Sequence, residues 1–173
     1  MRTLCILGVG ALALGLVVLG PPAARAADPR FTPDATEACL ADAVGRAAKT
    51  DCVGQSANAC MTHPDGANTA VIGFCLGQEA QLWDTRLNDA FAELLPLERA
   101  LDDSRPEGWS LPSRAKALRH MQRDWIRFRD TACQYSRLRY DSGSLANSAQ
   151  LACLMRLTAR QALDLEAVLE EVK

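Results

Sequence analysis

The sequence lacks the alternation of apolar and polar residues that is typical of β-strands, and it contains no internal repeat. It also lacks the Gly-x-Ser-x-Gly, His-Glu-x-x-His and phosphate-loop motifs of common enzyme classes. The only two histidines, His63 and His120, have no cysteine or histidine at zinc-finger spacing. The absence of Cys-x-x-Cys removes the thioredoxin motif and c-type haem attachment. We therefore expect a non-enzymatic protein without a catalytic, metal or cofactor site.

A basic excess is also missing, since 19 lysines and arginines stand against 21 acidic residues. This balance argues against a nucleic-acid-binding protein. With 11 glycines and 8 prolines the chain is not rich enough in either residue for disorder, and its 49% apolar content suits a globular domain.

The first 26 residues have the pattern of a secretory signal peptide. Arg2 is followed by an apolar run over 4–19, and Ala24-Arg25-Ala26 is a cleavage pattern. The run is shorter than the ~20 residues of a membrane span, and no cysteine follows it to carry a lipid. We expect cleavage after Ala26, no membrane anchor afterwards, and a location in the periplasm or outside the cell. A flexible lead over 27–33 and a single domain over 34–173 would follow.

Six of the seven cysteines lie beyond the expected signal peptide, and an even number behind an export signal predicts a disulfide framework. Cys133 and Cys153 are equally distant from Gly143, so two helices that fold back at this turn would bring them together. The same symmetry about Thr50 favours Cys39 with Cys60, which leaves Cys52 with Cys75. Cys60 with Cys75, together with Cys39 and Cys52, is a close competitor.

Apolar residues recur in steps of three and four along the chain, which predicts an all-α fold. Two short helices, over 34–48 and from about 51 to 62, would form an N-terminal helical hairpin. Three long helices would follow, over 69–101 with an end or a kink near Pro96, over 113–140, and from 145 or 147 to 171. We expect an antiparallel bundle stapled by disulfides, with Gly143 in the last turn at a positive φ. Its expected core anchors are Trp83, Leu87, Phe91, Trp125 and Phe128.

The long helices differ in charge. The segment 113–140 carries eight basic and two acidic residues, whereas 75–107 carries eight acidic and three basic ones. Several polar side chains lie beside the apolar stripes, where they would bond across the long helices or form a partner site. These residues are Glu79, Asp84, Asn88, Gln122, Arg129 and Asp130. Trp109, in the loop over 104–112, would pack against the helix ends or contact a partner.

An ordered set of residues resembles the LprI-type lysozyme-inhibitor domain, a family of small exported bacterial helical proteins. The resemblance covers about 60–165 and is carried by a set of motif residues. They are Cys75, Glu79, Trp83-Asp84, Leu87-Asn88, Phe91, Gln122, Trp125, Phe128-Arg129-Asp130, Cys133, Gly143-Ser144, Cys153, Thr158, Arg160 and Leu163. The family takes its name from a lipoprotein that inhibits lysozyme, but this chain lacks a lipobox. The hairpin with Cys39 and Cys52 is an addition to the shared pattern.

The resemblance implies a protein that binds another protein, such as a lysozyme or another cell-wall hydrolase. Lysozymes are commonly cationic, so the acidic 69–101 helix would attract such a partner at low salt. One alternative is an enzyme or small-ligand carrier with a polar site between the 69–101 and 113–140 helices. That alternative requires a deep pocket lined by Glu79, Asp84 and Arg129. A further alternative is a structural protein of the envelope.

Overall fold

The computed structural model describes residues 30–62, 68–108 and 110–173, and it is all-helical over these ranges. The expected signal peptide, residues 27–29 of the lead segment, the turn at 63–66 and Trp109 lie outside them. The helices are α1 (Asp34–Asp42), α2 (Gly45–Asp51), α3 (Gln55–Met61), α4 (Thr69–Asp103), α5 (Arg114–Leu138) and α6 (Leu145–Val172). No strand occurs within the described ranges, so the predicted all-α fold is confirmed.

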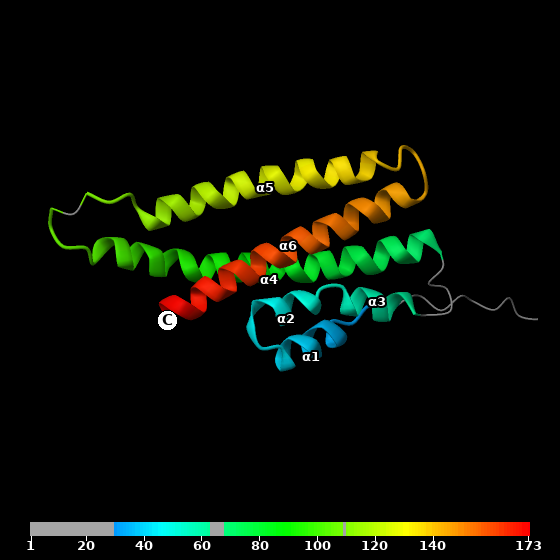
Figure 1. Ribbon diagram of the computed structural model, residues 1–173, viewed down its shortest axis with the longest axis horizontal. Helices are drawn as coiled ribbons and strands as arrows, with labels where there is room; N and C mark the ends of the chain where they lie inside the picture. The colour runs from blue at the N-terminus through cyan, green and yellow to red at the C-terminus, as the bar shows by residue number, and fades with distance from the viewer. Residues whose placement is uncertain (1–29, 63–67, 109) are drawn as a thin grey trace, which may run out of the picture.

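The three long helices run antiparallel in chain order, and the three short ones cover one side of them (Figure 1). α4 packs most extensively against α6, and α5 packs mainly on α6 and to a lesser extent on α4. The core lies between α4, α6 and the short helices, and it contains Trp83, Leu87, Leu94, Met155, Leu163 and Leu165. Among the described residues, no helix is long and apolar enough to cross a membrane.

The N-terminal region differs from the predicted two-helix hairpin. The first predicted helix is divided at Ala43 and Val44, which have extended backbone, and the second begins only at Gln55. Gly45 and Gly54 have φ angles of 82° and 97°. Residues with a side chain adopt such angles rarely, so these two glycines permit the additional turns. The result is three short helices instead of two.

The favoured disulfide pairing of this region was wrong, and the competitor is correct. Cys39 is bonded to Cys52 and Cys60 to Cys75, with Cα atoms 5.5 and 5.8 Å apart. The reason is the break between α1 and α2, which folds Cys39 back onto the residue that follows α2. Cys60, at the end of α3, then lies beside the second turn of α4. Cys133 is bonded to Cys153 across the α5–α6 hairpin, as predicted.

α4 continues through Pro96 to Asp103, which is the second of the two predicted courses. Pro96 is exposed while Leu94 and Glu98 are buried. The α5–α6 turn contains Gly143 as expected, but its positive φ belongs to Asp141, at 48°. Glycine suits position 143 for another reason, because a Cβ atom there would lie 3.0 Å from the carbonyl oxygen of Tyr140, which is a tight contact.

The predicted core anchors are more deeply buried in α4 than in α5. In α4, Trp83 and Leu87 are buried and Phe91 is half-buried. In α5, Trp125 is half-buried against the core, but Phe128 is exposed, so its assignment as an anchor was wrong. The inner face of α5 instead follows Leu118, Gln122, Trp125, Arg129, Ala132 and Cys133. Because the disulfide holds Cys133 inward, Phe128 is rotated to the side of the helix that faces solvent.

Candidate functional site

Glu79 is a fully buried carboxylate on α4 that holds the short helices against the long ones. Its Oε1 accepts hydrogen bonds from Gly54 N at 2.6 Å, Thr36 Oγ1 at 3.0 Å and Trp83 Nε1 at 3.1 Å. Its Oε2 accepts one from Ala57 N at 2.6 Å. Thr36 and Ser56 also bond to each other through backbone N–H and hydroxyl groups. No cation pairs with Glu79 among the described residues, so neutral donors alone compensate its burial.

Glu79 therefore does not belong with the other predicted network residues. It faces α1 and α3, whereas Asp84 and Arg129 line an open hollow of about 290 Å³ between α4, α5 and α6. The remaining walls of the hollow are Ala80, Gln81, Leu154 and Thr158. The pocket lined jointly by Glu79, Asp84 and Arg129, on which the enzyme alternative depends, is thus not formed.

Arg129 is the central charged group of this hollow. Its guanidinium lies 5.0 Å from the centroid of the Trp125 ring and donates from Nε and Nη2 to Asp130 Oδ1, at 2.9 and 2.8 Å. Its Nη1 is 3.6 Å from Asp84 Oδ1, which is an ion pair without a hydrogen bond. Stacking on Trp125 and two carboxylates fix the side chain, while Nη1 remains directed to the α4 side.

The two amide members of the predicted network have separate roles. Gln122 is buried and accepts a hydrogen bond from Gln161 Nε2 at 3.2 Å, so it joins α5 to α6. Asn88 is exposed and donates to Asp84 Oδ2 at 3.1 Å within α4. The predicted cross-helix bonding therefore holds for Gln122 and Arg129, while Asn88 bonds only within its own helix.

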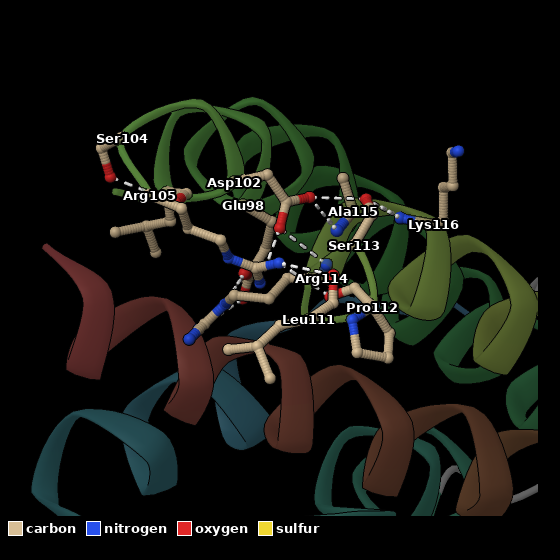
Figure 2. Close-up of polar contacts among 11 residues, drawn as sticks. Glu98, Asp102, Ser104, Arg105, Leu111, Pro112, Ser113, Arg114, Ala115 and Lys116 are labelled. Carbon is tan, nitrogen blue, oxygen red and sulfur yellow. Dashed lines mark hydrogen bonds and ion pairs between the residues drawn. The ribbon is translucent and has the colours of Figure 1, made fainter. Parts of the chain in front are cut away.

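The α4–α5 junction contains a second cluster of charged groups (Figure 2). Asp102 accepts hydrogen bonds from Ser113 Oγ at 2.6 Å and from the backbone N–H groups of Arg114 and Ala115 at 2.8 and 3.0 Å. These bonds, the one from Ser113 first, and the charge of Arg105 lower the pKa of Asp102 to about 2. A carboxylate at the start of α5 satisfies N–H groups that have no partner within the helix.

Two arginines complete this junction. Arg105 pairs with Asp102 at 2.8 Å and donates to the carbonyl oxygens of Leu111 and Pro112, which closes the loop (Figure 2). Arg114 pairs with the buried Glu98, and the hydrogen bond that Arg114 donates to the Glu98 carboxylate raises the pKa of Arg114. The junction thereby fixes where α5 begins relative to α4, and it positions the whole of α5.

One flank of α5 carries exposed apolar side chains, among them Phe128, which the sequence pattern had placed inside, and Met121, whose sulfur accepts a hydrogen bond from Gln161 Nε2 of α6 at 3.2 Å. Met121, Phe128 and Tyr135 are 41%, 61% and 68% exposed. They are spaced seven residues apart, so they form one row along the helix, which we call the α5 ridge. The signal that could have identified it is Cys133. If Cys133 faces inward, residues one and three turns before it, Arg129 and Gln122, do so too.

The basic residues of α5 are also directed outward. Lys116, Arg123 and Arg127 are exposed, and in the described part of the chain only Arg127 has an ion pair, at 3.5 Å to Asp124. We call these three residues the α5 basic row. By contrast, Glu79, Glu98 and Asp102 of the acidic helix have partners inside the molecule. Its remaining exposed acids include Asp89 and Asp103.

These arrangements provide surfaces for binding. In the ranges that the structure describes, no group of three His, Cys, Asp or Glu residues could hold a metal ion. The cysteines of these ranges are bonded in pairs. The Arg129 hollow, the α5 ridge and the α5 basic row are candidate contact surfaces.

Comparisons with known proteins extend this description. The family model described as lysozyme inhibitor LprI matches residues 60–165, which include all of α4 and α5 and most of α6. The chain is also 29% identical over 154 residues to an uncharacterized 17.7 kDa protein in the puhA 5' region of Rhodobacter capsulatus. That match covers 88% of this chain and 92% of the relative. No solved structure matches the chain.

Proposed function

Because the chain belongs to the LprI lysozyme-inhibitor family, we propose that it is an exported, non-enzymatic domain that binds and inhibits a lysozyme-type hydrolase. The observation that carries the proposal is the family match over 60–165, since this range contains the α4–α6 framework and its outward-facing surfaces. The disulfides support the exported location, because such bonds persist in oxidising compartments.

The disulfide-closed framework also suits an inhibitor physically. A binding surface that is already ordered loses little conformational entropy on association, which favours affinity. Here Cys133–Cys153 closes one end of the α5–α6 pair, and the Asp102 and Glu98 contacts fix the other end of α5. α5 is therefore held at both ends, and its outward face is presented without rearrangement.

The test is turnover of a purified lysozyme on bacterial cell walls with increasing amounts of the oxidised, exported protein. We expect inhibition that saturates, and direct binding by calorimetry with a matching affinity. The control is the same protein after reduction and alkylation, which should lose inhibition as its framework loosens. Absence of both inhibition and binding at tens of micromolar and low salt would contradict the proposal.

A second candidate function is the carriage of a small ligand at the Arg129 hollow. Its basis is a volume of about 290 Å³, close to the lower end of ligand pockets, with a guanidinium in the wall. Arg129→Ala would abolish binding of such a ligand. If instead Arg129→Ala lowers only stability and leaves lysozyme inhibition intact, the hollow is a structural feature.

A further inference from the structure

We infer that α5 is the helix that contacts the hydrolase, and that its outward face fits the carboxylate-bearing substrate cleft of a glycoside hydrolase. This inference rests on the proposed function and adds the surface and the part of the partner that it meets. It differs from the sequence prediction, in which the acidic helix attracts a cationic enzyme.

The α5 ridge has the dimensions of a contact that enters a groove. Met121, Phe128 and Tyr135 span about 21 Å at the rise of an α-helix. Single exposed apolar residues are normal on a protein surface, but a row of three large ones on one helix marks an interaction site. An apolar helix ridge laid into an elongated groove is a recurrent mode of recognition.

The exposed charges of α5 indicate what the groove contains. The α5 basic row lies about 120° around the helix from the α5 ridge, and in the described residues its only ion pair is the exposed contact of Arg127 with Asp124. The positive charge of α5 is thus available to a partner with negative charge. On α4, Glu98 is bound to Arg114, Glu93 to Lys173 and Asp84 to Arg129. Because these acids of α4 are paired with basic residues of the same chain, the negative electrostatic field that α4 presents to a partner is weaker than its composition indicates.

A glycoside hydrolase carries negatively charged carboxylates in the cleft where its substrate binds. Cleavage of the glycosidic bond canonically uses two Asp or Glu side chains that flank it. A cleft lined by one sign of charge concentrates the field even when the enzyme as a whole is cationic. The α5 basic row complements such a cleft, and the α5 ridge complements its apolar walls. The outward surface of α5 therefore complements the cleft of the enzyme better than it complements the cationic exterior of the enzyme.

The experiment compares three double variants with the wild type, all at exposed positions so that folding is preserved. Phe128→Ser with Tyr135→Ser removes the ridge, and Arg123→Glu with Arg127→Glu reverses the row. Asp89→Lys with Asp103→Lys reverses charge on α4 as the matched control. Circular dichroism melting verifies folding, and inhibition and calorimetric binding are measured for a lysozyme.

We expect each α5 double variant to raise the inhibition constant tenfold or more and the α4 control to change it less than about twofold. A chitin oligosaccharide that occupies the enzyme's cleft should displace the wild-type protein competitively. If the α4 control loses inhibition while the α5 variants keep it, or if the oligosaccharide does not compete, the inference is wrong and the proposed function stands.

Failure of the proposed function has a different signature. In that case the wild-type protein neither binds nor inhibits the enzyme, and the inference fails with it. Vesicles with anionic lipids serve as the other probe. If the wild type binds these vesicles but no lysozyme, and the α5 variants do not bind them, the face recognises a lipid surface and the inference is overturned.

Discussion

α4 and α5 are antiparallel neighbours of opposite charge, but they direct their charged residues differently. α4 turns Glu79 and Glu98 into the molecule, where each is buried and hydrogen-bonded. α5 turns Lys116, Arg123 and Arg127 outward and keeps Arg129 close to the core. Charge density along a sequence therefore does not indicate where a field is presented, because burial and pairing remove part of it.

The comparison also separates the two kinds of contact that hold the helices together. α4 is joined to the short helices by a buried carboxylate and a disulfide, both of which are inaccessible to solvent. α5 is joined to α4 by ion pairs at the junction and at Arg129, which are partly accessible. We expect substitutions on the inward side of α4 to affect stability most, and those on the outward side of α5 to affect it least.

The largest effect is expected for Glu79→Ala. The substitution leaves the buried donors of Gly54, Ala57 and Thr36 without an acceptor, at a cost of about 1–3 kcal/mol each when no water replaces it. We predict a loss of roughly 3 kcal/mol or more in the free energy of unfolding, measured in urea. Glu93→Gln, on the exposed side of the same helix, is the control and should change it by less than about 0.5 kcal/mol. Equal losses would show that Glu79 is not the joint described above.

Removal of the Cys60–Cys75 bond should have the next largest effect. Cys60→Ser with Cys75→Ser frees a loop of 15 residues in the unfolded chain, which costs about 2–4 kcal/mol in the free energy of unfolding. A single Cys39→Ser variant then tests the pairing itself. Mass spectrometry after alkylation should find the label on Cys52. A label on Cys60 would restore the pairing that was first predicted.

The two sides of α5 are compared by Trp125→Ala and Phe128→Ala. Trp125 packs against the core and under Arg129, so its removal should cost about 2 kcal/mol, which is less than for a fully buried ring. Phe128 is mostly exposed, and its removal should cost less than about 0.5 kcal/mol. Thermal melting of both variants measures the difference. A larger loss for Phe128→Ala would place α5 in the rotation that the apolar pattern predicted.

The effect of Asp102→Asn on stability is expected to depend on pH. The pKa of Asp102 is lowered to about 2 in the folded chain, whereas an unfolded aspartate titrates near about 3.9. The stabilisation is therefore fully present above the unfolded pKa and is lost as the pH falls toward about 2. The variant should melt below the wild type at neutral pH, and the gap should narrow between about pH 4 and pH 2. A difference in melting temperature that is independent of pH would show that the charge of Asp102 does not stabilise the start of α5.

The sequence was sufficient for the class of fold and for most of the long helices. Steps of three and four apolar residues predicted the three long helices to within a few residues, and Ser113 caps α5 through a bond from Lys116 N. Such patterns are local, so they are visible in the sequence. The Cys133–Cys153 pair was predictable because both residues lie on helices that meet at one turn.

The parts that failed depend on rotation and on contacts between distant segments. Apolar character alone placed Phe128 inward, but the bond at Cys133 and the Gln122–Gln161 contact hold α5 in a rotation that leaves Phe128 exposed. Glu79 was grouped with Asp84 because both are polar residues beside the apolar stripe, yet five residues of α-helix turn the two side chains to different sides. No pattern within α4 could indicate that its partners are Thr36, Gly54 and Ala57.

The sequence by itself determined that this chain is helical, that its cysteines come in pairs and that its motif residues resemble the LprI family. Those properties follow from residue spacing and composition, which need no knowledge of neighbours. Only the tertiary structure decided which cysteine of the N-terminal region meets which, and which side of α5 faces solvent. The physical reason is that both depend on the packing of helices far apart in the chain, and this packing places the basic and apolar residues of α5 on the surface.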